Sequence, residues 1–409
     1  INRHACESGQ KGLYRYSDSQ LSAGQLNGLF ASNQSHREVN SSMEGVAEKG
    51  QGVPAVKPGA SADLEWLTPG LEQDMSVLAP GGVHRNVPLT QVSRWRVGGL
   101  APLVVAPGSV TELQRIMAYI SRHGVPYVVL GSSSNLLFAD EGLRVLAIHI
   151  GARLGDLRIE GTRVWSEAGI WVPAFARQLA LAGLTGAEHT CGIPGTLGGL
   201  LCMNGGSQRK GIGDHVLDVT SVTPSGEKRV RSRSECGFRY RRSVFQGLGE
   251  IIVGARFRFA AADSPSSVRR EMLAILGQRR RKFPRKLPNC GSVFVSNPAM
   301  YAQYGPPGAV IEQCGLKGMR VGGAMISPLH GNFIVNNDGA CAADILTLIG
   351  VARRTVREQT GYDMAAEVCY VTPAGEIMPA HIKAEGLCVP GSGADMAGIV
   401  PDAASGTDQ

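Results

Sequence analysis

The sequence predicts a globular chain of mixed α and β structure that contains a parallel strand–helix–strand unit of α/β type. Two observations lead to this class. Hydrophobic residues make up 43% and charged residues 18% of the 409 residues, which is typical of a protein with a sizeable core. In residues 102–131, two short apolar runs flank an amphipathic segment, which is the pattern of two parallel strands joined by a helix.

The elements of this unit follow in order. Residues 102–106 are an apolar strand, and residues 125–131 are a second one. Between them, Ser109 and Glu112 form a predicted N-terminal cap, apolar residues then recur at helical spacing, and Gly124 ends the helix.

Further elements are predicted along the rest of the chain. They are a helix over 172–182, a hairpin turning at 224–226, a strand over 251–259, a helix over 266–283 ended by Pro284, a strand over 331–336, a helix over 340–360 ended by Gly361 and a strand over 367–371.

The two ends of the chain lack such patterns. Residues 1–85 are rich in Ser, Gly, Gln, Asn and Ala without a sustained period, which predicts a disordered leader, and residues 376–409 predict a loose tail. We expect a cytoplasmic protein, or one of an organelle stroma if the leader is a targeting segment. Six acidic residues between positions 44 and 74 argue against a transit peptide.

Charge and cysteine content exclude several classes of protein. The net charge of +7 and pI of about 9.0 suit an anionic small substrate, whereas 6% aromatic residues without basic interleaving argue against nucleic acid. The nine cysteines are odd in number and form no CxxC pair, so we expect neither zinc nor disulfides, and no metal site. No apolar run reaches the roughly 18 residues of a membrane span, so we expect no membrane insertion.

Three segments are candidates for chemistry. Small residues over 131–142 follow a strand and suit a turn whose N–H groups approach a phosphate, although an ordinary Ser/Asn turn is equally compatible. Residues 191–208 combine six glycines and one proline with apolar residues, which favours close backbone approach to a flat or anionic ligand. In 289–298 a lone hydroxyl, Ser292, follows the basic run 279–286; it is either reactive or closes a turn with Gly291.

Several stretches together resemble the UDP-N-acetylenolpyruvoylglucosamine reductase family, over roughly residues 86–375. The resemblance is carried by WRVGG (95–99), VLGSSSNLLFADEG (129–142), GIPGTLGG (192–199), YRRSVF (240–245), CGSVF (290–294), GLKGMRVGGAMISPLHGNFIVN (315–336) and AEVCYV (366–371). It implies a two-subdomain FAD-binding domain of the vanillyl-alcohol-oxidase (PCMH) type over 86–270, divided near 155, and an α+β substrate-binding domain over 271–375. The implied reaction is the NADPH-dependent reduction of the enolpyruvyl ether of UDP-N-acetylglucosamine to UDP-N-acetylmuramate.

The resemblance also implies three catalytic residues. Ser292 would donate a proton to the enol intermediate, Arg241 would bind the carboxylate or enolate with its fork, and Glu367 would stabilise the enol or relay a proton. Arg242 remains an alternative to Arg241, and a strand-edge salt bridge is the alternative for Glu367. The chain departs from the family pattern at Ala365, where the family usually has a first glutamate.

Cofactor and substrate residues are implied in the same way. For non-covalent FAD, despite the nearby His189 and Cys191, they are Gly131, Ser132, Ser133, Ser134, Asn135, Gly192, Ile193, Pro194, Gly195, Gly198, Asn204 and Tyr240. For the UDP-sugar they are Lys286, Asn297 and Lys317, although one extra residue separates Ser292 from Asn297. The longer segment 299–312 either covers the site or only lengthens a loop.

Two other functions remain compatible with these patterns: an oxidase of the same flavin fold that acts on a sugar or alcohol, and a catalytically silent flavin- or nucleotide-binding protein. Ser292 and Glu367 argue against the oxidase, whereas Ala365 leaves the silent protein open. Flavin absorbance near 450 nm supports the reductase or the oxidase, and consumption of NADPH that depends on the enolpyruvyl substrate isolates the reductase. We expect a monomer or weak oligomer whose partner is a small molecule.

Overall fold

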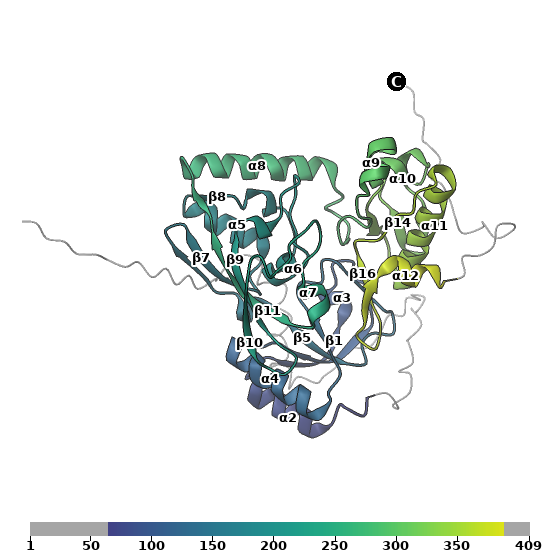
Figure 1. Ribbon diagram of the computed structural model, residues 1–409. Coiled ribbons are helices and arrows are strands. Elements are labelled where there is room, and N and C mark those ends of the chain that lie inside the picture. The colour runs from purple at the N-terminus through teal and green to yellow at the C-terminus, as the bar shows by residue number, and fades with distance from the viewer. Residues whose placement is uncertain (1–63, 388–409) are drawn as a thin grey trace, which may run out of the picture. The chain divides into compact units, whose positions relative to one another are not determined.

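The computed structural model describes residues 64–387 (Figure 1). Its first sheet has the order β1-β2-β5-β3, with β1 at Val83–Pro88, β2 at Leu100–Val105, β5 at Leu146–His149 and β3 at Tyr127–Leu130. Both β2 and β3 pair in parallel with β5. The predicted parallel unit is therefore confirmed, with β5 inserted between its two strands.

The connecting helix α4 spans Val110–His123 and has the predicted ends. The Ser109 hydroxyl accepts a hydrogen bond from the Glu112 N–H at 3.1 Å, and Gly124 adopts φ +63°, which glycine tolerates without strain. Its apolar face is buried at Leu113, Ile116, Met117 and Ile120. These residues share one core with Leu71 and Met75 of α2 (Pro69–Leu78).

A second, antiparallel sheet has the order β10-β9-β11-β7-β6. Its strands are β6 (Leu157–Glu160), β7 (Arg163–Glu167), β9 (Val216–Val222), β10 (Lys228–Ser232) and β11 (Ile251–Arg258). The predicted hairpin joins β9 to β10, and Gly226 in its turn has φ +91°. Three helices lie near this sheet: α5 (Val172–Leu181), α6 (Leu197–Cys202) and α8 (Pro265–Lys282) (Figure 1).

The C-terminal part has its own core and a small antiparallel sheet. The sheet contains β13 (Arg320–Val321), β14 (Ala324–Ile326) and β15 (Ile334–Asn336). Around it lie α9 (Pro298–Tyr304), α10 (Pro307–Gln313) and α11 (Ala342–Thr360), which ends at Gly361 with φ +75° as predicted. The remaining short elements are α3 (Leu89–Val92), η2 (Ala152–Leu154), β8 (Leu184–Thr185), η3 (Glu188–Thr190), η4 (Ile212–Asp214), α7 (Phe245–Leu248) and β12 (Ala260–Ala261).

A third sheet, β17-β16-β4, joins early and late segments of the chain. Strand β4 (Leu136–Phe138) pairs in parallel with β16 (Cys369–Val371), and β16 pairs with β17 (Ile377–Pro379). The fully buried Trp95 strengthens the junction, because its indole N–H donates to the Ile334 carbonyl at 2.7 Å. Residues that follow β3 are thereby placed beside residues that precede β16.

Order extends beyond the predicted limits at both ends. Residues 64–85 were expected to belong to a disordered leader, but they form α2 and the start of β1. Similarly, β17 and α12 (Ala380–Glu385) lie within the predicted loose tail. Each helix buries only two residues, in α12 the small Ala380 and Ala384, so neither leaves a clear hydrophobic period. Residues 1–63 and 388–409 lie outside the described residues. None of the described helices is long and apolar enough to cross a membrane.

Candidate active site

Two of the small-residue segments lie against each other. Residues 131–135 connect β3 to β4, and residues 192–196 precede α6. A Cβ added at Gly131 would lie 2.6 Å from Thr196 Oγ1, and one at Gly195 would lie 3.1 Å from Ser134 Oγ. This spacing leaves no room for larger side chains between the loops, so the predicted cofactor segments are brought together.

Ser133 lies in the first of these two loops, residues 131–135 and 192–196, which together are called the double loop below. It has φ +48°, a left-handed conformation that is uncommon for serine, and its buried hydroxyl has no hydrogen-bond partner in the described chain. A buried hydroxyl without a partner costs free energy unless a ligand supplies one. An orphan hydroxyl in a turn of small residues fits the phosphate-bearing part of a dinucleotide such as FAD.

Other residues predicted to hold the cofactor have structural partners. The Asn204 side chain donates to the Arg239 carbonyl at 2.9 Å and accepts from the Gly213 N–H at 3.0 Å. Its amide therefore holds the segment around Arg239, whereas the prediction placed it against the cofactor. Gly198 lets α6 approach Ala168 closely, since a Cβ there would lie 3.1 Å from the Ala168 Cβ.

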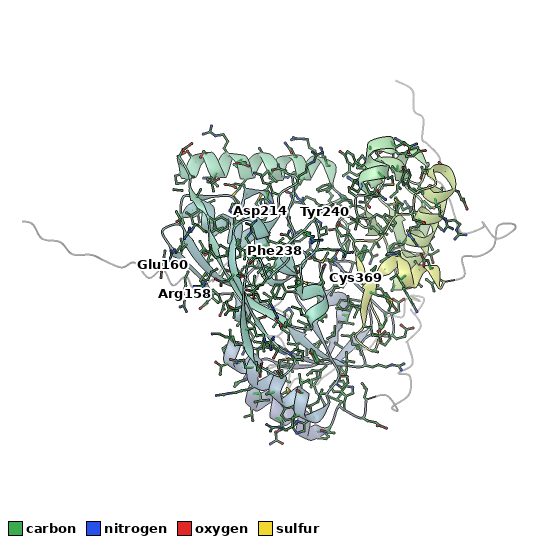
Figure 2. The ribbon with its side chains drawn as sticks, viewed as in Figure 1. Arg158, Glu160, Asp214, Phe238, Tyr240 and Cys369 are labelled. Carbon is green, nitrogen blue, oxygen red and sulfur yellow. The ribbon has the colours of Figure 1, made fainter. Side chains whose placement is uncertain are left out.

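A two-residue turn after Arg239 presents Tyr240 and Arg241. Arg239 and Arg242 exchange backbone hydrogen bonds at 3.0 and 3.1 Å, and Arg241 at the tip has φ +55°. Such a conformation is strained for arginine and is typical of functional sites. Tyr240, labelled in Figure 2, is 60% exposed, with the Arg241 guanidinium carbon 5.2 Å from its ring centroid.

The turn directs Arg241 to Glu367. Arg241 Nε lies 2.7 Å from Glu367 Oε1, and the two side chains are 24% and 17% exposed. The contact is an ion pair in which the Nε–H does not point at the carboxylate oxygen. Arg241 Nη2 also donates to the Gly206 carbonyl at 3.2 Å. Arg242 is exposed, so the geometry favours Arg241 over this alternative.

Burial changes the proton affinity of Glu367. Loss of solvent raises the pKa of its carboxyl group above the ordinary value, and the Arg241 guanidinium acts in the opposite direction. The carboxyl group is therefore closer to holding a proton at neutral pH than an exposed glutamate is. A group of this kind can stabilise an enol or relay a proton.

Ser292 lies on a strand-like segment beside Glu367. The Glu367 N–H donates to the Val293 carbonyl at 2.7 Å, and Val295 N–H donates to the Ala365 carbonyl at 3.0 Å. Gly291 has φ +82°, so the chain turns immediately before the serine. The Ser292 side chain makes no hydrogen bond with the described residues, which leaves its hydroxyl free to contact a ligand.

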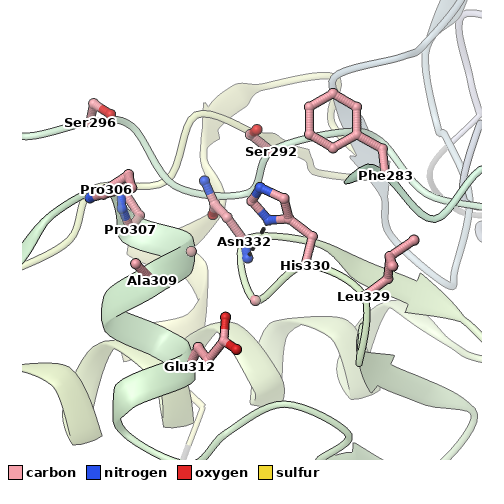
Figure 3. A pocket seen from close by; sticks show the side chains of 12 residues that line it. Phe283, Ser292, Ser296, Pro306, Pro307, Ala309, Glu312, Leu329, His330 and Asn332 are labelled. Atoms are coloured by element: carbon pink, nitrogen blue, oxygen red, sulfur yellow. Dashed lines mark hydrogen bonds between the residues drawn. The ribbon is translucent and has the colours of Figure 1, made fainter. Parts of the chain in front are cut away.

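Ser292 also lines a pocket of about 370 Å³ (Figure 3). The wall is formed by Phe283, Ser292, Ser296, Pro306, Pro307, Gly308, Ala309, Glu312, Leu329, His330, Gly331 and Asn332. The N-cap and first turn of α10 contribute Pro306, Pro307, Gly308 and Ala309, so part of segment 299–312 forms a wall of this pocket. A pocket of this volume suits a small molecule.

The three residues predicted to bind substrate are less directly placed. Lys317 pairs with the pocket residue Glu312 at 2.7 Å, so its charge is already partly compensated. The Asn297 side chain accepts from the Ala299 and Met300 N–H groups and caps α9. Lys286 is exposed and does not line the pocket. None of the three therefore offers a free cation or amide within the pocket.

Sequence reasoning missed Phe283, His330 and Asn332. The Asn332 amide brackets the Phe294 backbone with hydrogen bonds of 2.8 and 2.9 Å, which holds the Ser292 segment in place. His330 accepts from the Asn332 N–H and packs against Phe283 at 5.4 Å between ring centroids. His330 and Asn332 lie in the family motif over 315–336, whereas Phe283 lies in the basic run 279–286 and carries no signal of its own.

The fold and the double loop define an FAD-binding flavoprotein: residues 101–230 match the family described as FAD binding domain. Residues 283–371 match that described as UDP-N-acetylenolpyruvoylglucosamine reductase, C-terminal domain. The chain is 42% identical over 300 residues to UDP-N-acetylenolpyruvoylglucosamine reductase 1 of Corynebacterium glutamicum, covering 73% of this chain and 89% of that protein. It is 38% identical over 288 residues to the reductase of Synechococcus sp., covering 70% and 91%.

A solved structure agrees with these relatives. The UDP-N-acetylenolpyruvylglucosamine reductase of Thermus caldophilus is 32% identical, with a TM-score of 0.60 and coverage of 70% of this chain and 98% of that one. The chain belongs to the UDP-N-acetylenolpyruvoylglucosamine reductase family.

Family membership confirms the predictions of fold class, enzyme class and cofactors. The chain is an FAD-dependent oxidoreductase of peptidoglycan precursor synthesis that uses NADPH, with an FAD-binding part and a reductase C-terminal part.

Proposed function

We propose that Ser292, Arg241 and Glu367 carry out the reduction of the enolpyruvyl ether of UDP-N-acetylglucosamine to UDP-N-acetylmuramate. Bound FAD supplies the hydride that it receives from NADPH. One vinyl carbon takes that hydride and its neighbour takes a proton, so negative charge builds on the substrate carboxylate between the two steps. The protein must place a proton donor at one carbon and a cation at the carboxylate.

The ion pair between Arg241 and Glu367 is the observation that carries this proposal. It lies beside the Ser292 segment, where Glu367 N–H donates to the Val293 carbonyl. The Arg241 fork would bind the carboxylate and stabilise the enolate as charge develops. Ser292 would give its proton to the neighbouring carbon. Glu367, whose pKa is raised by burial, would then give a proton back to the serine oxygen.

The cofactor would be held by the loops that contain Gly131, Ser133 and Gly195, without a covalent bond. The Cys191 thiol supports the non-covalent mode, because it is directed to the Met272 carbonyl at 3.8 Å in α8. Burial also raises the pKa of this thiol to about 11, which suppresses the nucleophilic thiolate at neutral pH.

The remaining expectations complete this proposal. Residues 86–270 would form the FAD-binding domain and residues 271–375 the substrate-binding domain, with the polypeptide working in the cytoplasm as a monomer or weak oligomer. Lys317 would contact the UDP-sugar only after it leaves Glu312, and Asn297 only after its amide turns toward the pocket. Lys286 would be the third contact.

The test is NADPH consumption by the full chain, measured with and without the enolpyruvyl substrate. We expect absorbance near 450 nm from bound flavin and NADPH oxidation that depends on the substrate. Flavin binding without substrate-dependent NADPH oxidation would contradict the proposal. Oxygen consumption with a sugar or alcohol would then favour the oxidase, and the absence of any turnover would favour the silent protein.

A further inference from the structure

Arg279, in the last turn of α8, lies between the glycine-rich loop and the pocket wall. A Cβ added at Gly192 would lie 2.5 Å from Arg279 Cδ and 2.6 Å from Nε, so the end of the arginine side chain packs directly against the loop at this glycine. On the other side, the guanidinium carbon is 4.8 Å from the ring centroid of Phe283, which lines the pocket. Arg279 thus connects the predicted cofactor loop to the predicted substrate pocket.

The charge of Arg279 has no anionic partner within residues 64–387. No carboxylate of the described residues pairs with it, and its guanidinium donates no hydrogen bond to them. Burial lowers the pKa of Arg279, and the nearby cation Arg285 lowers it further. A partly buried cation beside a second cation is unfavourable unless an anion binds there.

The neighbouring thiol does not supply that anion. Cys191 is the group whose negative charge would favour charged Arg279, but burial raises the pKa of the thiol to about 11. It is therefore protonated at neutral pH. The positive charge of Arg279 is left for a ligand.

We propose that Arg279 binds the pyrophosphate of a nucleotide that enters the pocket, with Arg285 as a second cation. This inference rests on the proposed function, in which both the UDP-sugar and NADPH carry a nucleotide pyrophosphate. The planar fork of arginine matches phosphate oxygens, and the Phe283 ring and Gly192 hold the fork in one orientation. The anion would also relieve the repulsion between the two arginines.

The experiment compares Arg279→Met and Arg279→Lys with Arg280→Met in the full FAD-loaded chain. Arg280 is the matched control because it lies on the same helix but is exposed and has no ion pair within the described part of the chain. Flavin fluorescence is titrated with UDP and, separately, with NADP⁺. We expect the Arg279→Met variant to raise the Kd of at least one of them by tenfold or more, the Lys variant by less, and the control by no more than threefold.

The source of the pyrophosphate follows from which titration changes: UDP for the substrate, NADP⁺ for the reductant, and both for a shared site. A thermal midpoint that is unchanged or raised in ligand-free Arg279→Met supports an anion site, whereas a purely structural arginine would lower it. Unchanged Kd values for both ligands, or equal losses in Arg279→Met and Arg280→Met, would overturn the proposal. The proposed function fails separately, if the wild-type chain does not oxidise NADPH in the presence of substrate.

Discussion

Arg241 Nε and Glu367 Oε1 lie 2.7 Å apart, although one residue follows β10 and the other precedes β16. The contact joins the turn between β10 and α7 to the C-terminal part of the chain, immediately beside the segment of Ser292. Because a partly buried ion pair depends on both members, loss of either one leaves an unpaired charge. The following experiments test the consequences of this arrangement.

Ser292→Ala separates the two halves of the reaction. We expect NADPH to bleach the flavin at the wild-type rate, because hydride entry does not use the hydroxyl. Reoxidation by the enolpyruvyl substrate should fall by about 10²–10⁴-fold, the usual effect of losing a proton donor. Stopped-flow absorbance measures both steps, and Ser296→Ala, which removes another pocket hydroxyl, is the control. Normal reoxidation in Ser292→Ala would remove the serine from the mechanism.

Arg241→Lys keeps the charge but loses the planar fork. We expect reoxidation of the flavin by substrate to slow by about 10²–10³-fold, because a compact ammonium cannot contact Glu367 and the substrate carboxylate in the same way. Arg242→Lys, in the exposed neighbour, should retain the wild-type rate. If instead Arg242→Lys is the slow variant, the assignment between the two arginines is reversed.

Glu367 should impose a distinct pH dependence. Burial raises the pKa of its carboxyl group, so the oxidative half-reaction should show an ionisation above the ordinary glutamate range that disappears in Glu367→Gln. Since Arg241 lowers this pKa, Arg241→Met should move the ionisation to higher pH. A profile that Glu367→Gln leaves intact would assign the ionisation to another group.

The same shift has a stability consequence whose sign is fixed. Between the ordinary pKa and the raised pKa of Glu367, the folded chain binds more protons than the unfolded chain. The free energy of unfolding should therefore decrease as pH rises through that interval and level off above it. Denaturant titrations at several pH values should show a flatter profile for Glu367→Gln.

Gly131→Ala tests the double loop. The added methyl would lie 2.6 Å from Thr196 Oγ1, so the loops must separate and the bound flavin should be lost or weakened. The ratio of absorbance at about 450 nm to protein absorbance measures flavin content. Gly247→Ala is a matched control, because nothing lies within 4 Å of its added Cβ. Thr196→Ala should partly restore flavin to the Gly131→Ala variant, and failure to do so would argue for a cause other than this contact.

Trp95→Phe tests the junction between the two parts of the chain. The change removes the hydrogen bond to the Ile334 carbonyl in a fully buried environment, so we expect a loss of about 1–3 kcal/mol in the free energy of unfolding. Trp66→Phe removes a similar bond, to the Arg144 carbonyl, at a more exposed position and should cost less. Equal losses in the free energy of unfolding would mean that the buried hydrogen bond contributes no more to stability than the exposed one.

Local patterns were sufficient for most elements of the fold. The cap at Ser109, the stop at Gly124 and the apolar spacing between them predicted α4 to within one residue, because these signals act over neighbouring residues. They were insufficient for α2 and α12, whose few buried positions give no clear period. The insertion of β5 between β2 and β3 was also beyond local patterns, since strand order depends on contacts between distant segments.

For the candidate site, the sequence was enough to nominate Ser292, Arg241 and Glu367 by their motifs, but it held no information on their distances. The approach of Arg241 to Glu367 requires a strained turn at residues 239–242 and the pairing of β4 with β16, and both are products of the folded chain. The same is true of Arg279: within a basic run all cations look alike, and only packing against Gly192 and Phe283 distinguishes the partly buried one from its solvated neighbours. Residue types specify which chemistry is available, whereas burial and proximity, which decide pKa values and pairing, exist only after the distant segments have met.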